Sequence, residues 1–305
     1  MKAFVVIATK GRAKETYVLL DYLARQTLPA EQILLVGSEQ KDIEGFDRHP
    51  LSVQGLAVSM LSKAGLTTQR NAGLNALTPA VKDLNPEDWF VAFFDDDFRP
   101  APDWLANTAK AMANDRQIVG ITGNVLADGV LSEFGIPEDD APLYLSGAKA
   151  PMAHWSSACK VEQLEGLYGC NMVYRGTMAA SHRFDENLPM YGWQEDWDYS
   201  NRALALGKLV LQPDCLGVHL GVSGGRTSGV RFGYSQISNP VFLLRKGTMS
   251  WRKALTLMFR NVTANSAKTV LGVRIKDFPG RLRGNLMAFG HLLTGKLHPL
   301  HVLKI

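Results

Sequence analysis

Short apolar runs alternate with helical segments through the first 130 residues, and this alternation constrains the fold more than any other feature of the chain. The runs FVVIAT, ILLVG, WFVAFF and IVGITGNVLA have the length of strands, and helical patterns lie near residues 13–26, 67–78 and 102–114. Strands that alternate with helices form βαβ units. The sequence therefore predicts an α/β fold with a Rossmann-like, mostly parallel sheet flanked by helices, in which ligands lie beyond the carboxyl ends of the strands.

Regular patterns weaken in the middle of the chain and then return. Residues 129–165 are rich in turn-forming residues and show no clear period, so we expect long loops there. YGCNMVYRG and KLVLQP have the pattern of later strands, and a helix is expected near residues 196–206, ending at Gly207. These segments extend the α/β pattern beyond residue 165.

Composition places the chain among ordinary globular proteins. Of its 305 residues 46% are apolar and 20% are charged, which is enough for a large core. The three cysteines, Cys159, Cys170 and Cys215, form no C-x-x-C pair, which argues against a disulfide framework and a zinc ribbon. The first apolar run is too short for a signal peptide, and no run approaches the roughly 18 residues of a membrane span. We therefore expect a cytoplasmic protein.

Charge is distributed unevenly along the chain. Residues 241–305 hold 12 Lys and Arg against one acid, a net charge of +11. Residues 1–240 hold 21 basic and 28 acidic residues, a net charge of −7. The basic tail and the acidic body are therefore expected to face different partners.

Three consecutive carboxylates follow the apolar run WFVAFF, and three interpretations compete for them. A solvated acidic turn is the simplest. An EF-hand calcium loop is excluded, because the sixth position counted from Asp95 is Pro100, where that loop needs Gly. In the third interpretation, Asp95 and Asp97 hold a divalent cation while Asp96 turns toward the backbone or solvent, because alternate strand residues point to one side. Like charges this close need a positive partner.

Other segments, in order along the chain, make the third interpretation more specific. They are the residues Thr9 to Arg12, Gln69-Arg70-Asn71, and the segments RFDENLPMYGWQEDWDYSNRALALGK and PDCLGVHLG. Together with the triplet they resemble the family 2 inverting glycosyltransferases with the GT-A fold, of the bacterial surface-polysaccharide type. The resemblance covers roughly residues 3–247.

The resemblance implies a domain organisation. Residues 1–240 would form the GT-A domain, with a nucleotide-binding half over about 1–127 and an acceptor half over about 165–240. Residues 241–305 would form a basic helical extension. The implied reaction moves a sugar from a nucleoside-diphosphate sugar to a hydroxyl group of a saccharide acceptor, with a lipid-linked acceptor expected.

The family's metal and donor residues map onto this chain. Asp95 and Asp97 match the D-x-D pair that chelates Mn²⁺ or Mg²⁺ on the diphosphate, and His219 matches a histidine that often completes the metal shell. The residues matched to the nucleotide sugar are Thr9, Arg12, Ser38, Asp42, Arg70, Asp95, Asp96 and Asn171. This chain departs from many relatives in the loop LLVGSEQKDI, where Ser38, Glu39 or Asp42 would replace the usual base and ribose contacts.

Glu195 and Asp196 match the acidic motif at the start of the family's acceptor-side helix. In-line attack by an acceptor hydroxyl needs a carboxylate that takes its proton, and the resemblance assigns this role to Asp196, with Glu195 second. Helical spacing directs Trp193 and Trp197 to one face and both acids away from it, so the acids are expected to escape burial. The simpler alternative is that they offset the helix dipole.

The basic tail has amphipathic helical segments, with Trp251, Leu255, Met258 and Phe259 predicted on one face. Such helices suit an anionic membrane surface, so we expect peripheral binding on the inner face of the cell membrane. Packing of these helices on the protein itself is the alternative. A nucleic-acid partner is not expected, because no groove-reading motif appears.

Two other function classes remain open from the residues alone. A nucleotidyl- or phosphotransferase would use the same carboxylates, but such enzymes usually need a Gly-rich phosphate loop, and ATKGRAKE has only one Gly. A non-catalytic sugar-binding module would have no use for a base.

Overall fold

The computed structural model describes residues 1–132, 134–222 and 228–305, which divide into two compact units. The first unit contains residues 1–64, 68–183 and 202–225, and the second contains residues 65–67, 184–201 and 226–305. The expected domain boundary at residue 240 falls inside the helix α8, Gly229–Lys246, and stays a prediction.

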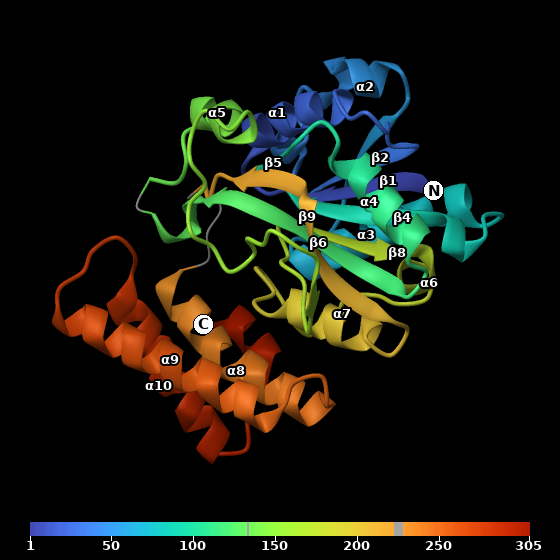
Figure 1. Cartoon of the computed structure of the whole chain (residues 1–305). Coiled ribbons are helices and arrows are strands. Elements are labelled where there is room, and N and C mark those ends of the chain that lie inside the picture. The colour runs from blue at the N-terminus through green and yellow to red at the C-terminus, as the bar shows by residue number, and fades with distance from the viewer. Residues whose placement is uncertain (133, 223–227) are drawn as a thin grey trace. The chain divides into compact units, whose positions relative to one another are not determined.

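The first unit is built around one sheet (Figure 1). Its strands are β1 (Lys2–Ala8), β2 (Gln32–Gly37), β3 (Ala57–Leu61), β4 (Trp89–Asp95), β5 (Phe98–Pro100), β6 (Ile118–Asp128), β7 (Glu162–Leu164), β8 (Asn171–Arg175) and β9 (Lys208–His219). The order is β3-β2-β1-β4-β8-β6-β9-β5, and β7 also pairs with β9. Among the described residues, six of the nine strands run in one direction, and β5, β7 and β8 run against them. The mostly parallel sheet is therefore confirmed.

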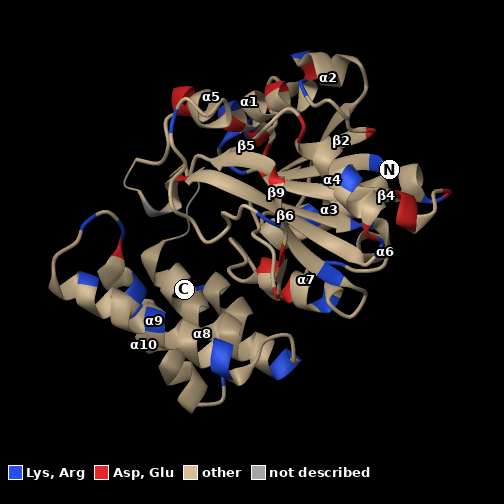
Figure 2. Ribbon diagram, viewed as in Figure 1, with Lys and Arg blue, Asp and Glu red and all other residues tan. Residues whose placement is uncertain are grey.

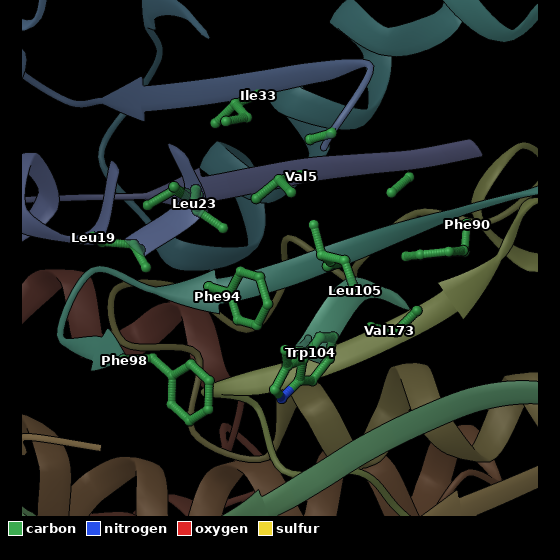
Figure 3. Close-up of a cluster of buried hydrophobic side chains, with 14 of the residues drawn as sticks. Val5, Leu19, Leu23, Ile33, Phe90, Phe94, Phe98, Trp104, Leu105 and Val173 are labelled. Atoms are coloured by element: carbon green, nitrogen blue, oxygen red, sulfur yellow. The ribbon is translucent and has the colours of Figure 1, made fainter. Parts of the chain in front are cut away.

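Helices of the first unit connect and cover the strands. They are α1 (Ala13–Ala24), α2 (Pro50–Val53), α3 (Leu66–Val81), α4 (Trp104–Asn114), α5 (Ala141–Leu145) and α6 (Gly176–Ala179). The expected helices near residues 13–26, 67–78 and 102–114 correspond to α1, α3 and α4. On one face of the sheet, Leu19 and Leu23 of α1 and Leu105 of α4 join the buried cluster with Val5 and Ile33, as Figure 3 shows.

The rings at the end of β4 hold the chain where the carboxylate triplet begins. Phe94 stacks on Phe98 with ring centroids 5.5 Å apart and meets Trp104 edge-on at 4.9 Å (Figure 3). All three side chains are buried, and rings of this size supply much of the apolar area that a core gains. The residue after Phe94 is Asp95, so core packing on β4 and β5 fixes the backbone on both sides of the triplet.

Two glycines let the ends of β6 and β9 approach each other. Gly129 follows the last residue of β6, and a Cβ atom there would lie 1.9 Å from the carbonyl oxygen of Leu220. Gly221 lies opposite with a φ of +69°, and a Cβ atom there would lie 2.2 Å from the carbonyl carbon of Gly129. Only glycine fits both positions without displacing the backbone. The close approach brings together the two residues that end these strands, Asp128 and His219.

The second unit is largely helical. Its helices are α8 (Gly229–Lys246), α9 (Trp251–Val270), α10 (Phe278–Leu293) and most of α7 (Glu195–Ala203), and a short 3₁₀ segment spans Pro299–Lys304. Tyr234 and Ile237 of α8 pack with Met258 of α9 and Ala288 of α10. Asn265 donates to Gln236 Oε1 and to Asn285 Oδ1, both at 2.8 Å, so these three buried amides pair with one another inside the bundle.

The tail helices differ from expectation at one position. Met258 is buried against α8 and α10, whereas Trp251, Leu255 and Phe259 stand exposed along α9. The inward face of α9 follows Ala254, Met258 and Asn265, and this turns the neighbouring Phe259 outward. Grouping Met258 with the exposed stripe was therefore wrong, and the stripe itself is confirmed. No helix within the described residues combines the length and the apolar character needed to cross a membrane.

Candidate functional site

Strand register brings Asp95, Asp128 and His219 to one edge of the sheet of the first unit. Asp95 ends β4 and lies beside Ala8, the last residue of β1. His219 ends β9 and pairs with Phe98 on one side and with Asp128 on the other. This is the carboxyl edge of the parallel strands, where α/β sheets bind their ligands.

Asp95, Asp97 and His219 form a group with the geometry of a metal site. One ligand atom from each residue lies within 4.8 Å of the others, and His219 Nε2 is 3.3 Å from Asp97 Oδ1. Within the described residues, the buried Asp97 Oδ1 has His219 Nε2 as its ionic neighbour and makes no hydrogen bond, so this acceptor atom is suited to a cation. Two carboxylates and one imidazole are ligands that suit Mn²⁺, and the carboxylates also suit Mg²⁺. The residues present therefore fit a divalent cation.

Neighbouring charges favour an ionised carboxylate at Asp97 and a protonated imidazole at His219. Burial would raise the pKa of Asp97, but His219, Arg12 and the backbone N–H of Val222 outweigh it and lower that pKa. Burial would likewise lower the pKa of His219, but the carboxylates of Asp97 and Asp128 outweigh it and raise that pKa well above the usual value. Without a metal, a charged histidine thus supplies the positive partner that the carboxylates need.

Asp96 turns away from the cluster, as strand alternation predicts, but not to solvent. Its Oδ2 accepts a hydrogen bond of 2.9 Å from Thr9 Oγ1, and its Oδ1 accepts one of 2.8 Å from Arg12. Burial raises the pKa of Asp96 to about 7, although Arg12 opposes that rise. Asp96 therefore joins β4 to the loop after β1, and the expectation that it faces backbone or solvent was wrong because Thr9 and Arg12 cover it.

Arg12 links three strand ends of the first unit. It donates to Asp96, lies 3.3 Å from Asp97 Oδ2, and donates to the carbonyl oxygen of Val222 at 2.8 Å. Burial opposes its charge, but Asp96 and Asp97 outweigh burial and raise its pKa. Arg12 is therefore held as a permanent cation beside the cluster.

Arg70 is buried inside the unit and does not lie on the surface of its helix. Its Nη2 donates to Asp95 Oδ1 at 3.1 Å and to the carbonyl oxygen of Gly169 at 2.9 Å. Asp95 keeps 26% of its side chain exposed, so it remains open to a ligand on its other side. Arg70 thus holds the Asp95 carboxylate from the buried side of the site.

Asn171 and Asp42, which the sequence assigned to the nucleotide sugar, are both fully buried. Asn171 is fully buried and accepts a hydrogen bond from Thr122 Oγ1, and its Nδ2 has no hydrogen-bond partner among the described residues. Asp42 accepts from the backbone N–H groups of Gly11, Ser38 and Glu39 at 2.7 to 2.9 Å, and also from the hydroxyl group of Ser38 at 2.8 Å. These bonds outweigh burial and lower the pKa of Asp42. Asp42 therefore holds the loops after β1 and β2 in place, and Ser38 lies in the second of these loops.

Asp128 is a residue of the site that sequence reasoning missed. Its Oδ1 lies 3.2 Å from His219 Nδ1, and its Oδ2 accepts from Tyr168 at 2.6 Å and lies 3.1 Å from His154 Nε2. Histidine metal ligands commonly pair their second nitrogen with a carboxylate, which fixes the ring. With Nδ1 paired to Asp128, Nε2 of His219 faces Asp97 and the cation position. No sequence signal marked Asp128, because its role depends on the pairing of β6 with β9.

Glu195 and Asp196 belong to the second unit, at the start of α7. Met190 and Gln194 have positive φ angles of 61° and 73°, which is uncommon for residues other than glycine. Gln194 directly precedes the acidic pair, and such backbone strain is often found at functional sites. Glu195 is 5% exposed, so the expectation that both acids escape burial was wrong for it. The loop folds back, so that Gly192 lies close to the Glu195 side chain. The carbonyl oxygen of Gly192 accepts a hydrogen bond from the backbone N–H of Glu195.

Comparison with known proteins supports the fold. The sequence matches no protein-family model and no curated protein. Among solved structures, residues 1–349 of TarS from S. aureus match 93% of this chain at 16% identity, with a TM-score of 0.56 and 79% of that chain covered. PcManGT, a mannosyltransferase from Pyrobaculum calidifontis with GDP-Man and Mn²⁺, matches 99% of this chain at 17% identity, with a TM-score of 0.52 and 85% of that chain covered.

GalNAc-T7, in a structure with UDP, GalNAc and Mn²⁺, matches 87% of this chain at 15% identity with a TM-score of 0.54. The present chain spans 57% of the length of that protein. This chain has the GT-A fold. At these identities the likeness shows the fold alone, so the reaction of this GT-A chain has to be argued from its own residues.

We predict that Asp128→Asn weakens binding of Mn²⁺ to this cluster by about 10- to 100-fold, the usual effect of losing an outer carboxylate partner. The amide is a poorer acceptor for His219 Nδ1–H and leaves the ring free to turn. Electron paramagnetic resonance titration of free Mn²⁺ measures the affinity without any substrate. Asp103→Asn, the same change at an exposed position, is the control. Equal Mn²⁺ affinity in the folded Asp128→Asn variant would contradict the positioning role.

Proposed function

We propose that this protein is a metal-dependent inverting glycosyltransferase of bacterial surface-polysaccharide synthesis. It transfers a sugar from a nucleoside-diphosphate sugar to a hydroxyl group of a saccharide acceptor. The observation that carries the proposal is the group of Asp95, Asp97 and His219 at the carboxyl edge of a GT-A sheet. Structures of similar fold add support, since they contain UDP, UDP-GlcNAc or GDP-Man, and two contain Mn²⁺.

In this proposal Asp95, Asp97 and His219 hold Mn²⁺ or Mg²⁺. The bound cation would stabilise the charge of the nucleoside-diphosphate leaving group. Arg70 holds the Asp95 carboxylate toward the donor, and Asp128 holds the His219 ring. Thr9, Arg12 and Ser38 lie in the loops after β1 and β2 on the nucleotide side. Asp96 accepts from the side chains of Thr9 and Arg12, and Asp42 accepts from the hydroxyl group of Ser38.

The remaining step needs a base. We assign the role of this base to Asp196, which matches the acidic motif of the glycosyltransferase family and lies two residues after the strained residue Gln194. Asp196 accepts the proton of the acceptor hydroxyl as that oxygen forms its new bond to the anomeric carbon and the bond to the diphosphate breaks. Attack from the side opposite the leaving group inverts the anomeric centre.

The alternatives account for fewer of these features. A nucleotidyl- or phosphotransferase would use the carboxylates, but the loop after β1 has one glycine and is tied to Asp42 and Asp96 through Gly11 and Thr9. A sugar-binding module would leave both the cation site and the strained acidic helix start without a role.

The Asp97→Ala variant should lose sugar transfer and also lose metal-dependent nucleotide binding, because it removes the most buried carboxylate of the cluster. The assay is incubation of the wild type and the variant with UDP-, GDP- and dTDP-sugars in Mn²⁺, with detection of the nucleoside diphosphate released. Asp103→Asn is the matched surface control. Transfer at near wild-type rate by Asp97→Ala, or release of pyrophosphate by the wild type, would reject the assignment.

The Asp196→Asn variant should behave differently. Loss of the base lowers kcat by roughly 10² to 10⁴-fold while donor and metal affinity stay unchanged. Calorimetry with the nucleoside diphosphate and Mn²⁺ measures affinity, and single-turnover transfer measures the chemical step. If Asp196→Asn loses donor affinity and keeps its rate at saturation, this residue positions the donor and another group takes the proton.

The second unit supports a further part of the proposal, namely binding to an anionic membrane on its cytoplasmic face, beside a lipid-linked acceptor. Trp251, Leu255 and Phe259 recur every four residues along α9 and are 58%, 52% and 71% exposed. Arg252 and Arg260 are exposed at adjacent positions on the same helix. Figure 2 shows Lys and Arg along α9, with few acids on α9 and α10. An apolar stripe flanked by bases fits an interface of apolar chains and anionic headgroups.

Vesicle co-sedimentation tests the membrane proposal. We expect binding to anionic but not neutral liposomes, weakened by salt because each base near the surface contributes about 1 kcal/mol. The Trp251→Ser/Phe259→Ser variant should lose this binding. The Val53→Ser/Phe134→Ser variant, which removes two exposed apolar side chains of the first unit, should keep it. If both variants sediment with anionic vesicles like the wild type, α9 does not bind the membrane.

A further inference from the structure

Trp155 is a large aromatic side chain that the proposed chemistry leaves without a role. It lies in the first unit, in the loop region before β7, and 56% of it is exposed. Its neighbour Ser156 is fully buried. The exposed part of the indole is therefore open to a ligand.

The backbone around Trp155 is tied to β6. Met152 N–H donates to the carbonyl oxygen of Leu126 at 2.7 Å, and Val125 N–H donates to the carbonyl oxygen of Ser156 at 2.9 Å. The hydroxyl group of Ser156 donates to the carbonyl oxygen of Gly123 at 2.8 Å. These bonds on both sides of residue 155 fix the backbone that carries the indole, which reduces the entropy that a bound partner has to offset.

Aromatic contacts connect Trp155 with the candidate metal site. The Trp155 ring lies 5.2 Å from the Tyr168 ring and 5.5 Å from the His154 ring. Tyr168 lies 5.9 Å from the His219 ring and donates to Asp128. Trp155 is thus the exposed end of a row of rings whose buried end is the imidazole ligand. The indole is thus two ring contacts away from His219, and a sugar attached to a group bound near His219 could extend toward it.

We propose that Trp155 is a platform on which a pyranose ring stacks. The inference rests on the proposed glycosyl transfer, which puts a donor sugar and an acceptor sugar beside the cation. One face of a pyranose presents C–H groups with partial positive charge, and the face of an indole is the negative side of its quadrupole. Sugar hydroxyl groups at the ring edge remain free for polar contacts. The shared chemistry is a pyranose, supplied by the donor or by the acceptor.

The test uses Trp155→Ala and Trp155→Phe in the full chain, with Met152→Ala as the control at another exposed apolar position of the same segment. Calorimetry with Mn²⁺ compares UDP and GDP with UDP-GlcNAc and GDP-mannose. Saturation-transfer NMR with methyl pyranosides measures sugar contact without nucleotide or metal. For Trp155→Ala we expect pyranose binding to weaken by roughly 3- to 10-fold, with Trp155→Phe close to wild type, since phenylalanine keeps a stacking face.

The two sources of the pyranose give different results. Weaker nucleotide-sugar binding with unchanged binding of UDP or GDP assigns the platform to the donor. Unchanged nucleotide-sugar binding with lost saturation transfer from the methyl pyranosides assigns it to the acceptor.

The inference is overturned if Trp155→Ala binds nucleotide sugars and methyl pyranosides as the wild type does. It is also overturned if binding of UDP or GDP alone falls equally, because that effect reflects distortion of the site. If the wild type binds no nucleotide with Mn²⁺, the proposed function fails, and the methyl-pyranoside measurement alone decides the platform. Absence of saturation transfer in the wild type then rejects it.

Discussion

Mutual repulsion among carboxylates at one sheet edge is the constraint on which the rest of the site depends. Three consecutive aspartates begin at the last residue of β4, and His219 lies between Asp97 and Asp128 of β6. Unpaired charges of this kind are costly inside a protein. Arg12, Arg70 and His219 supply the compensating positive charge, each from a different segment of the first unit. The same arrangement places Asp97 Oδ1 3.3 Å from His219 Nε2, and both atoms can serve as ligands of a divalent cation.

Core packing and backbone conformation bring these segments together at the carboxyl edge of the sheet. The stacked rings of Phe94 and Phe98 fix the backbone on both sides of the triplet. Gly129 and Gly221 let the ends of the paired strands β6 and β9 approach closely, where Asp128 lies opposite His219. Asp42 fixes the loops that carry the nucleotide-side residues. Packing, backbone conformation and charge therefore act on one edge of the sheet, and the proposed donor chemistry takes place there.

The sequence predicts the parts of this arrangement that depend on local pattern. Strand-length apolar runs and helical spacing locate β1, β2, β4 and the helices between them, and the spacing of the triplet separates Asp95 and Asp97 from Asp96. Partners that meet only through tertiary contacts were not predictable. Asp128 becomes part of the site through strand pairing. Arg70, which the resemblance matched to the nucleotide sugar, is buried and donates to Asp95. Glu195 is covered by a loop whose left-handed residues have no sequence signature. Met258 was misplaced because helical spacing alone does not say which edge of an apolar stripe faces the bundle.

The most direct test of the central claim is anomalous X-ray diffraction from crystals grown with Mn²⁺ and a nucleoside diphosphate. The account predicts one manganese peak bound by the carboxylates of Asp95 and Asp97 and by Nε2 of His219, with the diphosphate completing the coordination. A diphosphate bound at this edge without manganese, or manganese bound only elsewhere in the chain, would contradict it.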